Sequence, residues 1–314
     1  MPEWKVLIAD TLEAEAADHL RSQNIAFDDR PEVQPEELLQ IIPDYHALIV
    51  RSRTKPDAAL MQAASQLKVI GRAGVGVDNI DLEAAKAAGI AVVNTPTSTS
   101  LAVAEHTLSL IFALLRQIPL ADARMKAGEW PKKALMGAEL SGKVLGIVGV
   151  GNIGHLVAER AAAFGVQLLG YDPYLDDDAL KSRGCEPTTL EDLYARSDII
   201  TFHLPLSDET RGMVNAPALA AMKPGVRIIQ AARGGVIDEA ALLVALESEQ
   251  VAGAALDVFA EEPPGDSALI RHPNVIATPH IAAQTAEAQA RAAHDVAEEI
   301  VNALEGRPLR WQVV

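Results

Sequence analysis

The chain has 314 residues, enough for two domains, and carries 27 Lys and Arg against 43 Asp and Glu, a formal net charge of −16. This charge, with no basic run to meet phosphates, argues against a nucleic-acid partner or an anionic membrane surface, so any anionic ligand needs local cations. A single cysteine, Cys185, excludes an internal disulfide framework and a cysteine-cluster metal site, and no metal is predicted.

Short apolar runs alternate with amphipathic stretches through residues 5–94. This alternation is typical of a parallel sheet with helices on both faces, a doubly wound domain of flavodoxin-like type. Pro35 suits a first helical turn, and Gly89 suits a helix end. The predicted strands are 6–8, 47–50, 69–70 and 91–93, and the predicted helices lie near 13–21, 35–41, 58–63 and 82–88.

A breaker-rich joint follows at 94–98 and is a candidate hinge. The next predicted helix, 101–125, is interrupted by Pro119 and is too apolar all round for a surface helix. We expect it to be buried between domains, between subunits, or both. The arm after it, 126–140, has no regular period and either contacts a partner subunit or folds back on its own domain. We predict a homodimer formed through residues 101–140.

The stretch 143–173 predicts a β-α-β unit, with an apolar run at 144–148 followed by Gly149-x-Gly151-x-x-Gly154, a helix and a second strand. In this full context the glycine pattern indicates a dinucleotide site. Gly149 permits the tight turn, Gly151 lets the backbone approach a pyrophosphate, and Gly154 lets helix and strand pack closely. The helix N-terminus offers unpaired N–H groups to the phosphates.

Asp172 closes the second strand of this unit, where a carboxylate can bond both ribose hydroxyls of a dinucleotide. It also repels a 2′-phosphate, and Pro173, Tyr174 and Leu175 offer no arginine to receive one. The sequence therefore predicts NAD rather than NADP as the cofactor.

Further strands after this unit extend it into a Rossmann-type domain. A last helix, about 286–304, does not belong obviously to the same sheet. The simplest topology has the chain leave a first domain, build the nucleotide domain and return. We predict a discontinuous substrate-binding domain of residues 1–96 and 285–314 and an NAD-binding domain of residues 97–284, whose later strands are 198–202, 226–230, 251–256 and 275–277.

The beginning of the chain lacks the basic and apolar regions of a signal peptide. No apolar run approaches the length of about 20 residues that a bilayer span requires. We therefore expect a cytoplasmic protein without a membrane partner.

Hydride transfer to a 2-keto acid needs a proton donor, a group that tunes the donor, and a cation that holds the carboxylate. Of the eight histidines, His203 and His280 stand just after apolar strands in the nucleotide half, and ligands of doubly wound sheets lie at strand carboxyl ends. His203 could equally line the cofactor pocket, whereas His280 stands at the return crossing and is favoured as the donor. A purely structural place is preferred for His19, His46, His106, His155 and His272.

Glu261 and Glu262 stand in a loop before the last strand and could tune this donor, because a carboxylate bonded to an imidazole fixes its tautomer; they could also form a solvated acidic turn. Arg233 precedes two glycines and could deliver a guanidinium for bidentate carboxylate binding, or belong to a surface turn. Other groups that follow predicted strands and would face the same cleft are Arg51, Arg53, Arg72 and a possible backbone N–H nest at Gly74 and Val75.

In combination, the motifs of this sequence resemble those of the NAD-dependent D-2-hydroxyacid dehydrogenases over nearly the whole chain. Within that family the closest resemblance is to the D-3-phosphoglycerate dehydrogenases, which implies NAD-dependent oxidation of a phosphorylated 2-hydroxy acid. The alternatives are a reductase of hydroxypyruvate, glyoxylate or another 2-keto acid and, less favoured, an NAD-sensing corepressor-like binding protein. The resemblance to the whole family is carried by 149–154 with Asp172, 231–238, 254–259 with Glu261-Glu262-Pro263, and Pro279-His280. The closer resemblance is carried by Val50-Arg51-Ser52, 71–79, 136–140 and 284–289.

The resemblance also implies roles. Arg233 would hold the substrate carboxylate and carbonyl, and Glu262 would pair with His280, the acid–base residue. Arg51 and Arg72, with Arg53 as a further candidate, would bind a substrate phosphate, and the amides of Gly74 and Val75 would bind the carboxylate. The cofactor-binding positions would be Gly149, Gly151, Asn152, Ile153, Gly154, Asp172, His203, Pro205, Ala231, Arg233, Asp257 and His280.

Three features depart from the subfamily pattern. Thr97-Ser98-Thr99 stands where an Asn-containing stretch is frequent, and Ile281-Ala282-Ala283 follows the histidine where a Gly is common. The sequence ends at Val314 without a C-terminal serine-binding regulatory domain, so we expect no serine inhibition through such a domain.

Overall fold

The computed structural model describes residues 4–314, which fold into two compact units. Unit 1 comprises the N-terminal segment that ends at Thr99 and the C-terminal segment Ala283–Val314, and unit 2 is the continuous segment Ser100–Ala282. The sequence placed these two crossings after residues 96 and 284. Each unit is an α/β domain built on a parallel sheet, which confirms the predicted fold class.

The sheet of unit 1 has five parallel strands in the order β2-β1-β3-β4-β5, the flavodoxin-like order. The central strand β3 is buried at every position, as expected for a strand covered on both faces. The sequence did not reveal β2, because Ala-Phe-Asp-Asp is a half-exposed edge strand without an apolar run. The bounds are β1 Lys5–Ile8, β2 Ala26–Asp29, β3 Ala47–Val50, β4 Val69–Arg72 and β5 Ala91–Asn94.

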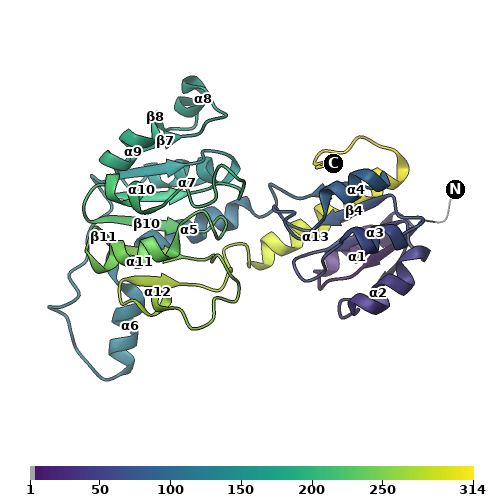
Figure 1. The fold of residues 1–314 in the computed structure, drawn as a ribbon, viewed down its shortest axis with the longest axis horizontal. Helices are drawn as coiled ribbons and strands as arrows, with labels where there is room; N and C mark the ends of the chain where they lie inside the picture. Colours follow the sequence, from purple (N-terminus) through teal and green to yellow (C-terminus); the bar gives the residue numbers. More distant parts are fainter. Residues whose placement is uncertain (1–3) are drawn as a thin grey trace. The chain divides into compact units, whose positions relative to one another are not determined.

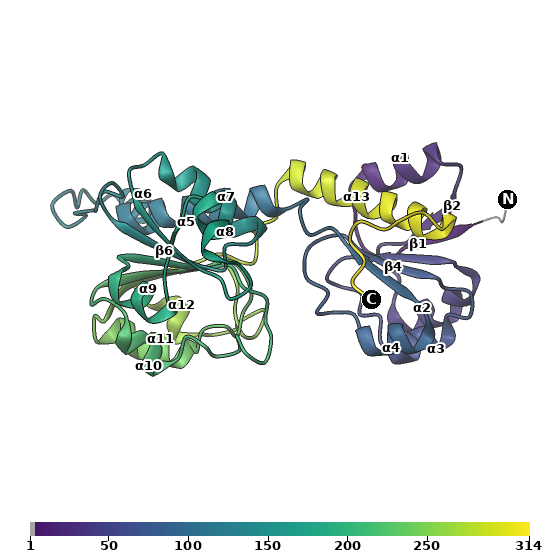
Figure 2. The ribbon, with the colours of Figure 1, turned by 90° about the horizontal axis from the view of Figure 1, so that it is seen from above.

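Helices cover both faces of this sheet (Figure 2). The last helix of the chain packs directly on β4, because a Cβ on Gly71 would lie 2.7 Å from Val296 Cγ2. The C-terminal segment is therefore part of the core of unit 1, and the yellow helix lies among the purple and blue elements in Figure 1. One face carries α1 Ala14–Ser22 and α13 Ala286–Glu305, and the other carries α2 Pro35–Ile41, α3 Ala58–Ala63 and α4 Leu82–Ala88.

The sheet of unit 2 has seven parallel strands in the order β12-β11-β10-β9-β6-β7-β8. The strand order reverses between β6 and β9, so the loops after these two strands run in opposite directions. In doubly wound sheets, ligands bind at such a reversal, at the carboxyl ends of the strands. The bounds are β6 Val144–Val148, β7 Gln167–Tyr171, β8 Glu186–Pro187, β9 Ile199–Phe202, β10 Val226–Gln230, β11 Val251–Leu256 and β12 Val275–Ala277.

Two layers of helices enclose this second sheet (Figure 2). The two hydrophobic clusters of unit 2 lie on opposite faces of it, one centred on Phe202 and the other on Ile147. One face carries α5 Ser100–Arg116, α7 Asn152–Ala162 and α8 Asp177–Ser182, and the other carries α9 Leu190–Arg196, α10 Ala216–Ala221, α11 Glu239–Glu247 and α12 Ala268–Arg271.

The long helix predicted at 101–125 is two helices, α5 and α6 Ile118–Lys126, separated at Gln117 with φ 53 and with Pro119 in the first turn of α6. α5 is largely buried within unit 2, whereas α6 buries no residue. The arm that follows α6 runs out from the body of unit 2 (Figure 1).

Within residues 4–314, no single helix is long and apolar enough to cross a membrane. Only α5 and α6 taken together reach that length and composition, and they are bent by 62°.

Candidate active site

The three glycines in the turn from β6 into α7 have different steric surroundings. Gly149 has φ 87, and a Cβ there would lie 2.5 Å from the carbonyl oxygen of His203. A Cβ on Gly154 would lie 2.1 Å from the carbonyl oxygen of Gly149, whereas a Cβ on Gly151 would meet nothing within 4 Å. The turn is therefore closed on its protein side and open at Gly151, where a pyrophosphate needs room.

The helix that follows this turn is ready for an anion. α7 begins at Asn152 with Gly151 as its N-cap, and no side chain caps it, so the amides of its first turn are left to a ligand. Both carboxylate oxygens of Asp172 are oriented by backbone amides: Oδ2 accepts from Val150 at 2.9 Å and Oδ1 from Tyr174 at 3.0 Å. Each oxygen keeps acceptor capacity for a ribose hydroxyl. These residues fit a dinucleotide.

Three other predicted cofactor residues lie at the carboxyl ends of β9 and β10. His203 follows β9, and its Nε2 lies 3.1 Å from Thr201 Oγ1. Burial lowers the pKa of His203 to about 4, so it is neutral near pH 7. This favours His203 as a support of the Gly149 turn over a role as proton donor. Ala231 is buried after β10, and the exposed Pro205 accepts from Thr210 Oγ1 through its carbonyl at 2.7 Å.

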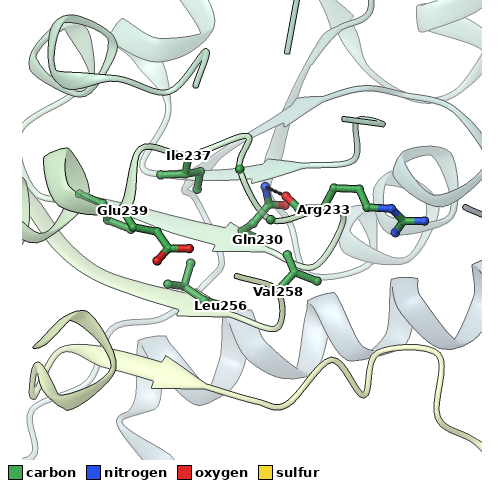
Figure 3. A pocket seen from close by; sticks show the side chains of 9 residues that line it. Gln230, Arg233, Ile237, Glu239, Leu256 and Val258 are labelled. Atoms are coloured by element: carbon green, nitrogen blue, oxygen red, sulfur yellow. Dashed lines mark hydrogen bonds between the residues drawn. The ribbon is translucent and has the colours of Figure 1, made fainter. Parts of the chain in front are cut away.

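Gln230 shapes the loop that carries Arg233 (Figure 3). Its amide accepts from the Ala232 N–H and donates to the Arg233 carbonyl, both at 3.1 Å, while the guanidinium extends away from the small cavity that Gln230 lines. A Cβ on Gly234 would lie 1.8 Å from the carbonyl oxygen of Phe259. The Arg233 loop is therefore pressed against the loop that carries Glu262.

Glu262 and His280 form a pair. His280 Nδ1 lies 2.8 Å from Glu262 Oε2, and Glu262 Oε1 accepts from the Phe259 amide at 3.1 Å. The carboxylate is thus fixed by the backbone on one side and orients the imidazole on the other. With Nδ1 engaged, Nε2 is the nitrogen left to exchange a proton with a ligand.

Asp257 is fully buried, and its carboxylate accepts the amides of Ile281 and Ala282 at 2.9 and 2.8 Å and the hydroxyl of Thr278 at 2.6 Å. Burial acts to raise the pKa of Asp257, but these hydrogen bonds together with His106 hold it below its ordinary value, so the group is ionised. Asp257, one of the cofactor-binding positions that the resemblance implies, therefore anchors the His280 loop.

In unit 1, Arg51 and Arg72 lie at the carboxyl ends of β3 and β4. Arg51 contacts Gln284 Oε1 and the Thr11 carbonyl, and Arg72 contacts Ser52 Oγ and the Ala73 carbonyl, all at 3.3–3.4 Å. The contacts of Arg51 are long for hydrogen bonds, so its guanidinium can still bind an anion.

Two other predicted substrate residues are already engaged within unit 1. Arg53 forms an ion pair with the buried Asp10 at 3.2 Å and donates to the Val33 and Ala9 carbonyls, so it has a structural role. The Gly74 amide donates to Thr95 Oγ1 at 2.8 Å. Of the two amides predicted to bind the substrate carboxylate, that of Val75 therefore remains the candidate.

The predicted residues thus gather at strand carboxyl ends within each unit: the glycine turn, Asp172, Arg233, Glu262 and His280 in unit 2, and Arg51 and Arg72 in unit 1. Sequence reasoning missed the residues that hold them. Asn79 donates to the Arg51 and Thr54 carbonyls, and Arg183 donates to the Val150 carbonyl of the glycine turn. Of these, only Asn79 carried a signal, because it lies in the stretch 71–79 that resembles the subfamily.

Comparison with known proteins supports the family resemblance found in the sequence. The chain is 47% identical over 305 residues to a D-3-phosphoglycerate dehydrogenase of Homo sapiens and 45% identical over 307 residues to one of Archaeoglobus fulgidus, covering 97% and 98% of this chain but 57% and 58% of those proteins. The chain therefore spans less than two thirds of the length of these curated relatives. A solved glyoxylate reductase from Paecilomyes thermophila is 34% identical, with a TM-score of 0.90 and coverage of 100% of this chain and 99% of that one.

Residues 108–282 match the NAD-binding domain of the D-isomer specific 2-hydroxyacid dehydrogenases. This match covers the glycine turn, Asp172, Arg233, Glu262 and His280, so the cofactor of the chain is NAD. Because the match takes in more than half of the chain and the fold is shared from end to end, the chain belongs to the D-isomer specific 2-hydroxyacid dehydrogenase family.

Proposed function

We propose that this chain is a cytoplasmic dehydrogenase that oxidises D-3-phosphoglycerate to 3-phosphohydroxypyruvate with NAD. The observation that carries the proposal is the 2.8 Å contact between His280 Nδ1 and Glu262 Oε2, next to a loop that presents Arg233. An imidazole, a carboxylate and a guanidinium are the groups that oxidation of a 2-hydroxy acid requires. The names of the relatives that match nearly the whole chain support the choice of substrate.

In this proposal each side chain has one task. Arg233 binds the substrate carboxylate and the oxygen on C2, for which a planar guanidinium is suited. His280 Nε2 takes the hydroxyl proton as C2 becomes a carbonyl carbon, and Glu262 stabilises the imidazolium that forms. Bound NAD supplies the acceptor for the hydride that leaves C2.

Arg51 and Arg72 are the proposed phosphate ligands. A protein with a net charge of −16 repels a phosphorylated acid at long range, so binding depends on local cations. Arg51 follows the buried strand β3, and Arg72 is the last residue of β4. Asn79 fixes the backbone of Arg51 by donating to its carbonyl at 2.9 Å. Arg53 is left out because Asp10 holds it.

Arg51→Ala and Arg72→Ala are each expected to lower kcat/KM for the phosphorylated substrate by about tenfold to a hundredfold, because one charge-assisted hydrogen bond contributes about 1.5–3 kcal/mol. Turnover of unphosphorylated 2-hydroxy acids should not change. The measurement is steady-state kinetics on a panel of both classes. Arg21→Ala, which removes an exposed arginine paired with Asp18 on α1, is the control. Equal loss on both classes, or no loss on either, contradicts the phosphate assignment.

A reductase of glyoxylate, hydroxypyruvate or another 2-keto acid is the second candidate. It is favoured by the glyoxylate reductase that the chain matches over 99% of that protein's length. The same panel separates the two, because this enzyme gains nothing from a substrate phosphate. A corepressor-like binding protein is favoured by no structural observation, and turnover that His280→Gln abolishes would exclude a purely binding role.

We also propose that the chain forms a homodimer through residues 101–140. α6 buries no residue within its own unit, and Trp130 and Met136 in the arm are 78% and 82% exposed. A groove of about 380 Å³ lies between the α5–α6 break and the start of β12, lined by Leu120, Val275 and Ile276 among others. Apolar surface of this kind is typical of subunit contacts.

Leu120→Glu and Met136→Glu are expected to shift the protein to half of its wild-type mass in sedimentation-velocity experiments, because a buried unpaired carboxylate opposes association. Val244→Glu is the matched control, since Val244 is an apolar residue that is 64% exposed on α11, away from the groove. If wild type already sediments as one chain, or if the control dissociates equally, the arm does not form the contact.

A further inference from the structure

His280 has a backbone conformation that needs support. Its φ is 54, in the left-handed region that costs a residue with a side chain about 1–2 kcal/mol. The amide of His280 donates to the carbonyls of Asp257 at 2.8 Å and Thr278 at 3.0 Å. The next two amides, of Ile281 and Ala282, donate to the Asp257 carboxylate at 2.9 and 2.8 Å. One residue, Asp257, therefore holds the three consecutive amides that fix the position of the His280 side chain.

The Asp257 carboxylate is fully buried, so its capacity to hold this loop depends on the donors around it. The backbone supplies two, and Thr278 supplies a third through its hydroxyl at 2.6 Å from Oδ1. Because the Thr278 hydroxyl proton points to the carboxylate, the hydroxyl oxygen is left as an acceptor.

The remaining donor comes from α5, far along the chain. His106 Nε2 lies 3.3 Å from Thr278 Oγ1 and 3.5 Å from Asp257 Oδ1. Both partners accept, so Nε2 carries a proton and is shared between them. Around His106 the helix buries Ala102, Val103, Thr107 and Leu110, and His106 reaches from this buried part of α5 to the loop.

We infer that His106 is a positioning residue for the proposed acid–base group His280, acting through Thr278 and Asp257. The Nε2–H of His106 completes the donor set of the buried carboxylate. The carboxylate holds the amides of residues 281 and 282, and these fix the left-handed backbone at 280 that directs the imidazole to Glu262. The inference rests on the proposed role of His280 and adds a residue, in a helix that precedes the glycine turn, on which that role depends.

The kinetic experiment compares His106→Leu with His106→Gln in the full-length protein with NAD. Leucine removes the donor, and glutamine keeps an N–H near the position of Nε2. His106→Leu is expected to lower kcat by about tenfold to a hundredfold, because a small displacement of a catalytic group costs up to about a hundredfold in rate. KM for NAD should stay near the wild-type value, and His106→Gln should recover most of kcat. Glu105→Gln, an exposed neighbour on α5, controls for changes to the helix.

A spectroscopic experiment makes the test independent of any substrate. A proton on His280 Nδ1 that is bonded to a carboxylate resonates far downfield in the proton NMR spectrum, and His280→Gln identifies the signal. The signal is expected to be retained in His106→Gln and lost or broadened in His106→Leu. If no 2-hydroxy acid is turned over, the proposed function fails, while this signal still decides whether His106 orders His280.

Thr278→Val and Thr278→Ser form a second pair, because valine removes the hydroxyl at nearly constant shape and serine keeps it. If His106→Leu does not fold, the two Thr278 variants test whether the contacts to Asp257 position His280. The inference holds if the leucine and valine variants lose kcat and the downfield signal while glutamine and serine retain them. It is overturned if the leucine and valine variants match wild type, or if both members of each pair lose activity equally.

Discussion

His280→Gln is expected to lower kcat/KM by about a thousandfold while KM for NAD changes little, because general acid–base catalysis contributes about 10²–10⁴-fold. Glutamine fills a similar volume and can still accept a hydrogen bond from the substrate hydroxyl, but it cannot take the proton. Glu262→Gln should cause a smaller loss, since the imidazole keeps a partner at Nδ1 but loses the charge that stabilises the imidazolium.

The measurement is steady-state kinetics with the substrate deuterated at C2. In His280→Gln a primary isotope effect on kcat should be fully expressed, because the chemical step becomes slow relative to product release. His294→Gln, which changes a half-exposed histidine on α13, is the control and should match wild type. Activity of His280→Gln above about a tenth of wild type would show that another group takes the proton.

Arg233→Lys is expected to lower kcat/KM by about a hundredfold, because lysine keeps the charge but loses the two-point contact to a carboxylate and to the oxygen on C2. The loss should appear in kcat as well as in KM, since the same guanidinium binds the acid and stabilises charge on the reacting oxygen. Gln230, Ala232 and Gly234 keep the loop in place, so the lysine variant should unfold at the wild-type temperature.

Chemical rescue tests whether the guanidinium of Arg233 is the group that is needed. Free guanidinium added to Arg233→Ala should restore part of kcat, and an equal concentration of a simple alkylammonium salt should restore less. Arg271→Ala, which removes an arginine paired with Asp266 at the surface, is the control and should show neither loss nor rescue. Full activity of Arg233→Lys would remove Arg233 from the substrate contacts.

The elements predicted from the sequence are those determined by local chemistry. Pro35 and Gly89 mark ends of α2 and α4, and the three glycines define the turn into α7, because few residue types tolerate those backbone conformations. The strands β2 and β8 were not predicted, because one is charged and half-exposed and the other has two residues.

The partners of the site residues could not be predicted in the same way. Arg51 and Arg53 look alike in sequence, and only the fold pairs the guanidinium of Arg53 with the carboxylate of Asp10, from another strand end. His106 was taken for an ordinary helical histidine, because its contacts to Thr278 and Asp257 depend on how α5 packs beside β11 and β12. A sequence pattern shows that a side chain follows a strand, and long-range packing determines whether that side chain is already engaged.

The close approach of Gly234 to the Phe259 carbonyl limits which residues can change without moving the Arg233 and Glu262 loops. Any larger residue at 234 would push apart the two loops that carry Arg233 and Glu262, so the positions of these loops depend on each other. Under the proposed roles, we expect changes of substrate preference to be accommodated more readily at Arg51 and Arg72 than at these two packed loops.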